Sequence, residues 1–214
     1  MQIDPLGDTA LIVRDLVLPS YHVADLLNVS RFPGLIEAVA SYETVGVFLD
    51  PAEFDYEGFE SLLEGLPVLE SEKPRRTLSI PICYELGEDL QGVANSLGIS
   101  KDEVISEHLS HAYLCYAIGF CPGFPFLGYL SRPISGVPRL PSPRAHTEPG
   151  SVGITGRQTG IYPIDRPGGW PIIARTPLTL VDEATHYFPI HAGDEILFRR
   201  IDESEFNKLK GLRF

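Results

Sequence analysis

The amino-acid sequence predicts two domains, an α+β domain over residues 1–75 followed by an all-β domain over residues 76–214. Two observations favour this division. The N-terminal part predicts the element order strand, helix, strand, strand, helix, which is typical of a small α+β layer. From Tyr113 onward the chain breaks into short extended pieces separated by glycine and proline, a pattern typical of a β-barrel or a β-sandwich.

The elements expected in the first domain follow from hydrophobic patterning. They are a strand (9–18), a helix (21–30), two strands (35–50) and a short helix (57–66). The first strand is rich in β-branched residues, and the first helix has its apolar residues at helical spacing. The two strands are expected to meet near residues 42–44, and Pro67 ends the second helix. The polar stretch LESEKPRRT (69–77) is the predicted linker.

The second domain is expected to open with a strand over residues 76–86. A helix over residues 88–98 follows, with Gly98 as its stop signal. Ser100 and Glu103 form a capping box that starts another helix, which reaches about His108. The later strands are predicted at residues 150–154, 171–176, 178–182 and 194–200.

The overall composition is that of an ordinary globular protein. Of the 214 residues, 43% are hydrophobic and 21% are charged, which suits a chain that buries a core. No run of about 18 apolar residues predicts a membrane span. The N-terminus MQIDPLGDTALIVRD carries acids where a secretory signal would be basic. We therefore expect a cytoplasmic protein.

The cysteines and the net charge exclude some classes of protein. Cys83, Cys115 and Cys121 are an odd number of cysteines, which favours free thiols over a disulfide framework. The formal net charge is −12, so the chain as a whole repels nucleic acid and anionic membrane surfaces. Neither is an expected partner.

Residues 119–171 differ from the rest of the chain in charge and in backbone. These 53 residues contain 10 of the 20 glycines and 10 of the 19 prolines. They also carry a local charge of +3, because five arginines stand against Glu148 and Asp165. Arginine forks bind carboxylates and phosphates, so the segment predicts a preshaped surface for a small anionic ligand or an acidic partner. The alternative is that the arginines are exposed loop residues with no binding role. The five are Arg132, Arg139, Arg144, Arg157 and Arg166.

Three stretches within this segment carry candidate binding features. GFCPGFPFLGYL (119–130) predicts either an apolar pocket wall or a core-facing strand with tight turns. In residues 148–163, glycines let backbone amides turn toward a ligand, and Gln158, Thr159 and Tyr162 supply neutral donors and acceptors. Residues 156–170 end in Trp170, which belongs either to a loop cluster that holds a ligand or to a turn folded onto the core.

Known catalytic and metal motifs are weak in this sequence. The glycine-rich stretch is neither a phosphate-binding P-loop nor a nucleophile elbow. The spacing His108-x-x-His111-x-x-x-Cys115 suggests metal ligands, but a fourth ligand is not evident. We favour histidines that interact with a helix end, and predict no metal site. No catalytic base is predicted, because no recognisable order of serine, histidine and acid occurs.

Several ordered motifs resemble one family over nearly the whole chain. They are LGDTALIV (6–13), IPICY (80–84), DLQGVANSLGIS (89–100), PGFPFLG (122–128), the two PR pairs (138–139 and 143–144), PGSVGI (149–154), QTGIYP (158–163), PGGW (167–170) and RTPL (175–178). Together these motifs resemble the carboxyltransferase-like family of allophanate hydrolase subunit 1. That family includes the B component of the prokaryotic 5-oxoprolinase and the kinase inhibitor KipI.

The resemblance implies a fold and a complex. The implied fold is a small α/β domain followed by a cyclophilin-like barrel, a carboxyltransferase-type domain. The implied activity is that of an ATP-dependent hydrolase in which three components, A (LamB/YcsF-like), B and C (KipA-like), together open the lactam of 5-oxoproline to glutamate. ATP is used by the complex, and no metal or biotin is predicted on this chain. Two alternatives stay open, an inhibitor of a sensor histidine kinase and a component of a urea or amide carboxylase system.

The resemblance also points to candidate site residues. Residues 156–170 are expected to form a rim of the barrel groove, with Trp170 as a wall or anchor. Arg157, Arg166, Ala174 and Glu148 depart from the usual family pattern and leave the exact substrate open. The candidate substrate-binding residues are Arg139, Arg144, Arg157, Gln158, Thr159, Tyr162, Trp170 and His108.

Overall fold

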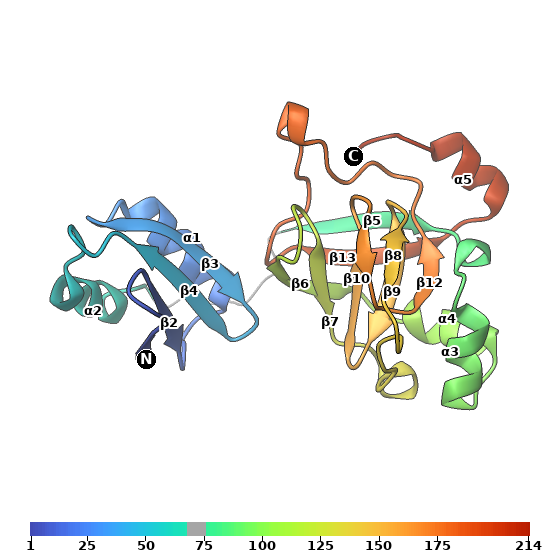
Figure 1. Ribbon diagram of the computed structural model, residues 1–214, viewed down its shortest axis with the longest axis horizontal. Coiled ribbons are helices and arrows are strands. Elements are labelled where there is room, and N and C mark those ends of the chain that lie inside the picture. Colours follow the sequence, from blue (N-terminus) through green and yellow to red (C-terminus); the bar gives the residue numbers. More distant parts are fainter. Residues whose placement is uncertain (68–75) are drawn as a thin grey trace. The chain divides into compact units, whose positions relative to one another are not determined.

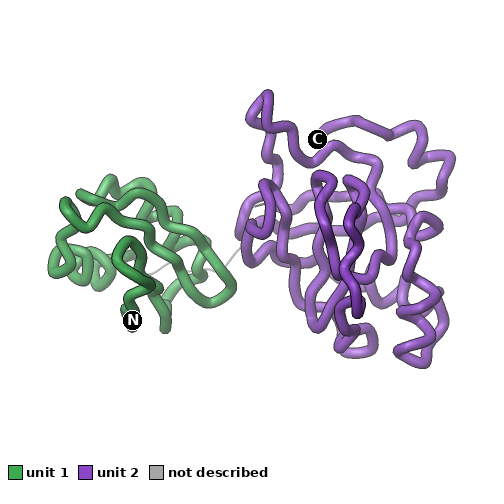
Figure 2. The backbone as a smooth tube through the Cα atoms, viewed as in Figure 1, with its two compact units in different colours: residues 1–73 green, residues 74–214 purple. Residues whose placement is uncertain are grey.

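The computed structural model describes residues 1–67 and 76–214 (Figure 1). The chain divides into two compact units, Met1–Lys73 and Pro74–Phe214 (Figure 2). The predicted linker (69–77) lies mostly outside the described residues.

Unit 1 is one antiparallel sheet with two helices. Its elements are β1 (Gln2–Pro5), β2 (Ala10–Arg14), α1 (Ser20–Ser30), β3 (Leu35–Ser41), β4 (Thr44–Leu49) and α2 (Tyr56–Glu64). The strands pair in the order β1-β2-β4-β3, and α1 packs against β3 and β4 (Figure 1). Val13, Val45 and Val47 are fully buried on the sheet, as are Val23 and Leu27 on α1.

The expected elements of unit 1 are confirmed, with one addition. The hairpin between β3 and β4 turns at residues 42–43, where Tyr42 has a φ of +55°. The side chain of Asp55 caps α2 by accepting a hydrogen bond from the backbone N–H of Gly58 at 3.1 Å. The sequence pattern does not predict β1, which pairs with β2 at the edge of the sheet.

Unit 2 is a larger, mostly antiparallel structure with helices beside it. Its strands are β5 (Thr77–Ile82), β6 (Tyr113–Ile118), β7 (Pro125–Gly128), β8 (Arg144–Thr147), β9 (Ser151–Thr155), β10 (Gln158–Ile161), β11 (Arg166–Gly168), β12 (Ile172–Arg175) and β13 (Glu195–Arg200). Its helices are α3 (Leu90–Leu97), α4 (Lys101–His108) and α5 (Glu203–Leu209), with short 3-10 turns at Tyr84–Leu86, Arg132–Ile134 and Glu183–Thr185.

The strands of unit 2 form one curved path and one separate arm. The path runs β5-β13-β6-β7-β10-β9-β12, with β5 and β13 parallel and the other pairs antiparallel. Strand β12 returns to the end of β5 through a single bridge, in which the backbones of Cys83 and Arg175 exchange two hydrogen bonds at 2.8 and 2.9 Å. No continuous strand ladder closes the path into a barrel among the described residues. Strands β8 and β11 pair with each other as the arm.

Helices α3 and α4 begin and end where the sequence predicts. Gly98 ends α3 with a φ of +70°, a left-handed conformation that glycine adopts without strain. Ser100 and Glu103 form the predicted capping box at the start of α4. Val93 and Ala94 of α3 and Val104 of α4 are buried in the main core of unit 2.

Two expectations for unit 2 are wrong in detail. The label all-β does not fit, because unit 2 contains the predicted helices α3 and α4 and also α5, which the sequence pattern does not predict and whose Phe206 packs on Cys83 and Ile201. Residues 178–182 form no strand, although Leu180 and Val181 are buried. Their alternating apolar residues contact the core from an irregular segment, because burial alone does not require a strand partner. No helix in the described part of the chain is long and apolar enough to cross a membrane.

A close backbone contact beside α3 gives a test of this fold. A Cβ on residue 87 would overlap the backbone carbonyl of Ile173, whereas a Cβ on residue 92 would meet nothing within 4 Å. We expect Gly87→Ala to lower the free energy of unfolding by about 1–3 kcal/mol through overpacking. The matched change Gly92→Ala, inside α3, should raise it by up to about 1 kcal/mol. Urea unfolding of both variants measures the difference, and equal effects of the two changes would contradict the placement of Gly87 against β12.

Candidate functional site

An aromatic cluster lies beneath the glycine- and arginine-rich segment. The ring of Trp170 contacts Phe124 edge-on at a centroid distance of 5.6 Å, and Phe124 contacts Tyr162 at 5.1 Å. Trp170 is only 5% exposed. A Cβ on residue 153 would stand 2.9 Å from the Cβ of Trp170, so Gly153 makes room for the tryptophan. Trp170 is therefore packed in the core, as in the second of the two interpretations, in which residues 156–170 form a turn folded onto the core.

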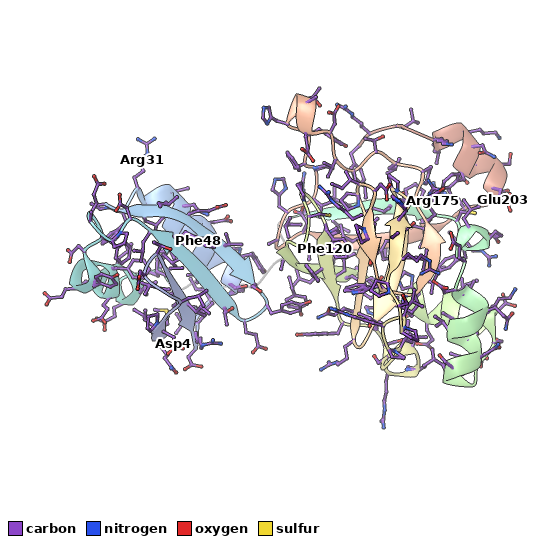
Figure 3. The ribbon with its side chains drawn as sticks, in the orientation of Figure 1. Asp4, Arg31, Phe48, Phe120, Arg175 and Glu203 are labelled. Carbon is purple, nitrogen blue, oxygen red and sulfur yellow. The ribbon has the colours of Figure 1, made fainter. Side chains whose placement is uncertain are left out.

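One aromatic side chain of the same cluster faces outward. Phe120, labelled in Figure 3, follows β6 and is 63% exposed. Its ring contacts Phe124 at 5.5 Å and Tyr162 at 6.2 Å. Its φ of +65° is uncommon for a bulky residue and is held by the tight loop around it. The stretch 119–130 thus supplies both buried core residues and one exposed aromatic ring.

Tyr162 connects this cluster to the arginines. Burial raises the pKa of its hydroxyl, so the group is protonated at neutral pH, while the nearby cations of Arg139 and Arg144 act in the opposite direction. The backbone N–H of Trp170 acts on this pKa in the same direction as the two cations. A buried hydroxyl beside cations is a donor suited to an anionic or strongly polarised oxygen.

Arg144 is held in place by two acidic residues directly before α3. One terminal nitrogen donates to Asp89 Oδ1 at 2.6 Å, and its Nε lies 3.5 Å from Glu88 Oε2. Asp89 Oδ2 in turn accepts a hydrogen bond from the backbone N–H of Ile172 at 2.6 Å. The sequence motifs suggest substrate binding alone for Arg144. The structure gives it a second, structural role in fixing β8 to α3.

Two more arginines lie near Tyr162 and Cys121. Arg139 is exposed, and its charge reaches Tyr162. Arg166, on β11, lies close enough to the thiol of Cys121 for its charge to act on that group. Burial raises the pKa of that thiol, and the charge of Arg166 acts to lower it. We refer to Arg139, Arg144, Arg166 and Tyr162 as the arginine–tyrosine surface. The sequence marks Arg166 only as a departure from the family pattern, and its position beside Cys121 is not predictable from spacing.

Arg157 and Gln158 lie away from this surface. Arg157 is on the turn between β9 and β10, and its guanidinium carbon lies 4.4 Å from the ring centre of Tyr129. Gln158 begins β10 and pairs with Thr155, whereas Tyr162 follows the other end of the same strand. The structure therefore does not bring these two candidates together with Tyr162.

His108 and Thr159 form a buried polar chain inside unit 2. The hydroxyl of Tyr84 lies 2.7 Å from His108 Nδ1, and His108 Nε2 lies 3.1 Å from Thr159 Oγ1. Thr159 donates its hydroxyl proton to the carbonyl oxygen of Gly153 at 3.1 Å, so it accepts from His108 Nε2–H. Tyr84 then donates to Nδ1, which fixes a neutral histidine tautomer. All three side chains are buried, and the chain is a structural feature of the core.

The structure also places a histidine beside a carboxylate near the arginines. His146 Nδ1, on β8, lies 3.1 Å from Asp165 Oδ2, and both side chains are exposed. This contact has the geometry of a base with an orienting carboxylate. The two residues are 19 positions apart, and only the pairing of β8 with β11 brings them together.

The spacing of His108, His111 and Cys115 does not produce a metal centre. Cys115 is fully buried on β6, and the nitrogens of His108 bond Tyr84 and Thr159. Among residues 1–67 and 76–214, no group of three or more histidines, cysteines or acids is placed to hold a metal ion. The three cysteines are free thiols.

The burial of His108 predicts a pH effect on stability. Burial, aided by the nearby His111, lowers the pKa of His108 from 6.5 to about 3. Between these values the unfolded chain binds a proton that the folded chain does not bind. The contribution of neutral His108 to the free energy of unfolding is therefore complete above pH 6.5 and is lost as the pH falls toward 3.

We expect His108→Gln to remove this part of the acid dependence, up to ~1.4 kcal/mol per pH unit. Urea unfolding of the wild type and the variant, from about pH 4 to about pH 7, measures it by difference, so that contributions of other groups cancel. Identical pH slopes for the two proteins would show that His108 is not buried in its neutral form.

Comparison with known proteins identifies the family. The family model described as carboxyltransferase domain, subdomain C and D, matches residues 1–189. The B component of the 5-oxoprolinase of Bacillus subtilis (strain 168) is 37% identical, over 98% of this chain and 96% of that protein. The resemblance carried by the sequence motifs is thereby confirmed.

Solved structures agree with this assignment. The crystal structure of TTHA0988 matches 90% of this chain with a TM-score of 0.79 and 32% identity, and this chain spans 40% of that longer chain. The K. lactis urea amidolyase matches 97% of this chain and 15% of its own length, with a TM-score of 0.71 and 16% identity. The latter likeness shows the fold alone. The chain belongs to the carboxyltransferase domain, subdomain C and D, family, and within it to the group of 5-oxoprolinase B components.

Proposed function

We propose that this chain is the B component of an ATP-dependent 5-oxoprolinase that hydrolyses 5-oxoproline to glutamate together with the A and C components. The observation that carries the proposal is the identity of 37%, over almost the full length of both proteins, to the B component of the Bacillus subtilis 5-oxoprolinase. The urea amidolyase shares only 16% identity, so a carboxylase role ranks below this one. A role as a histidine-kinase inhibitor has no comparable support.

The chemistry of the site fits a protein that binds an acidic amide. 5-Oxoproline carries a carboxylate, and opening its lactam develops negative charge on the carbonyl oxygen. Fixed cations and hydrogen-bond donors stabilise such charge without having to reorganise during the reaction. The arginine–tyrosine surface provides both, within a chain whose net charge is −12. We assign substrate binding to this surface and ATP to the assembled complex.

We also infer the domain division and the type of fold. Residues 1–75 and 76–214 are two domains, and the second is a cyclophilin-like barrel of the carboxyltransferase type. Support comes from the two compact units and from the bridge between Cys83 and Arg175, which returns β12 to the end of β5. The soluble, cytoplasmic setting expected from the sequence belongs to the same proposal.

Reconstitution tests the proposed function. We expect phosphate and glutamate to be released from ATP and 5-oxoproline only when this chain is combined with the A and C components. Arg139→Ala and Arg166→Ala should each lower kcat/KM by about 10- to 100-fold, because each removes a charge from the binding surface. Phosphate and glutamate assays of the purified complex provide the measurement.

Arg199→Ala is the matched control for the arginine variants. Arg199 is an exposed arginine of the same unit that pairs with Glu205 at 2.8 Å on β13 and α5. Its replacement should leave kcat/KM unchanged and cost at most about 1 kcal/mol of stability. No turnover from components shown to assemble would defeat the proposed function. Turnover that is insensitive to Arg139 and Arg166 would defeat the assignment of the surface.

A further inference from the structure

Strand β8 carries two buried donor groups that lack a partner. Thr147 is 3% exposed, and its Oγ1 makes no hydrogen bond to any residue that the structure describes. Arg144 Nη1 is also buried without a partner in the described part of the chain, although its sister nitrogen bonds Asp89. Buried polar groups are nearly always hydrogen-bonded. Two unpartnered donors on one short strand therefore point to a ligand that accepts from them.

The hydroxyl of Thr147 lies beside Gly168, together with the hydroxyl of Tyr162. A Cβ on residue 168 would stand 2.5 Å from Thr147 Oγ1 and 2.7 Å from the hydroxyl oxygen of Tyr162. Gly168 is also the residue directly opposite Arg144 in the pairing of β11 with β8. Any side chain at this position would press on both hydroxyls. Glycine keeps the space beside the two hydroxyls free of a side chain.

Each of these groups has a proton that it can donate, and two guanidinium groups lie near Tyr162. The Tyr162 hydroxyl donates to no residue that the structure describes, so its proton remains to be donated. The Thr147 hydroxyl has no acceptor among the described residues, and a guanidinium nitrogen can only donate. Arg139 adds a second cation close to Tyr162. A set of donors beside two cations selects an anionic oxygen, as a carboxylate supplies.

We propose that Thr147, Tyr162 and Arg144 Nη1 form a carboxylate-binding site at Gly168. The hydroxyls of Thr147 and Tyr162 donate to one or both carboxylate oxygens, and Arg144 Nη1 provides a third donor. The identification of the ligand as the carboxylate of 5-oxoproline rests on the proposed function. The existence of a carboxylate site does not, because it follows from the arrangement of the donors.

The test is a titration of the full-length chain, followed by the backbone amide signals in NMR spectra. The probes are 5-oxoproline and its neutral analogue 2-pyrrolidinone, which has the lactam but lacks the carboxylate. We expect 5-oxoproline to shift the amide signals of Thr147, Gly168 and Trp170, and 2-pyrrolidinone to leave them in place. Thr147→Val and Tyr162→Phe, which keep the shape of the side chains and remove the hydroxyls, should each raise the Kd for 5-oxoproline at least tenfold.

Thr155→Val is the matched control. Thr155 is a buried threonine of the same unit, but its Oγ1 donates to the carbonyl oxygen of Val137 at 3.1 Å. Removing this satisfied hydroxyl should lower the unfolding temperature and leave the Kd unchanged. Removing the unpartnered hydroxyl of Thr147 should raise the Kd. It should not lower the unfolding temperature, because no hydrogen bond within the described part of the chain is lost. A purely structural role of Thr147 predicts no change in Kd in either variant.

The remaining outcomes separate the two proposals. No shift of these amides by 5-oxoproline, an equal shift by 2-pyrrolidinone, or equal Kd values for Thr147→Val and the wild type would overturn the carboxylate site. Inorganic phosphate that binds the same amides more tightly than 5-oxoproline would also overturn it, by making the site one for phosphate. If the titration succeeds and the reconstituted complex does not turn over 5-oxoproline, the carboxylate site stands and the proposed function fails.

Discussion

The carboxylate of Asp89 ties together the three segments on which the site depends. The backbone N–H of Asp89 donates to the carbonyl oxygen of Ile172 at 2.8 Å, and the side chain of Asp89 accepts from the backbone N–H of Ile172 at 2.6 Å. The other carboxylate oxygen accepts from Arg144 at 2.6 Å. The start of α3, the start of β12 and the arm strand β8 are thus joined through one side chain. Charge-assisted bonds of this kind are short and directional, so they fix where Arg144 and Thr147 lie.

Close backbone approach is the second requirement of this region. Gly87 lets the segment before Asp89 pass against the carbonyl of Ile173, Gly153 leaves room for Trp170, and Gly168 places no side chain against the hydroxyls of Thr147 and Tyr162. The glycines predicted from the sequence to shape a ligand surface therefore do two different things. Gly153 permits packing that stabilises the unit, as Gly87 does outside that segment, and Gly168 keeps the space beside two donor groups free of a side chain. Glycines at which the backbone is closely approached thus serve both the packing of the unit and the proposed binding site.

Local signals in the sequence predict the helices well and the site only in part. Gly98 and the Ser100–Glu103 capping box act within a few residues, so they locate α3 and α4 directly. The tie of Arg144 to Asp89 spans 55 positions, and that of His108 to Thr159 spans 51. Such contacts depend on how strands pair, which residue spacing does not reveal. For the same reason Gln158 and Tyr162, four positions apart in the sequence, are expected in one site and lie at opposite ends of β10.

The most direct test of this account is a crystal structure of the reconstituted complex with 5-oxoproline bound. We expect the carboxylate of the ligand within hydrogen-bond distance of Thr147 Oγ1 and the hydroxyl of Tyr162, with Arg139 and Arg166 beside it. That result would establish the arginine–tyrosine surface as this chain's contribution to the active site. A ligand held entirely by the A or C component, with Thr147 and Tyr162 remote from it, would contradict the account.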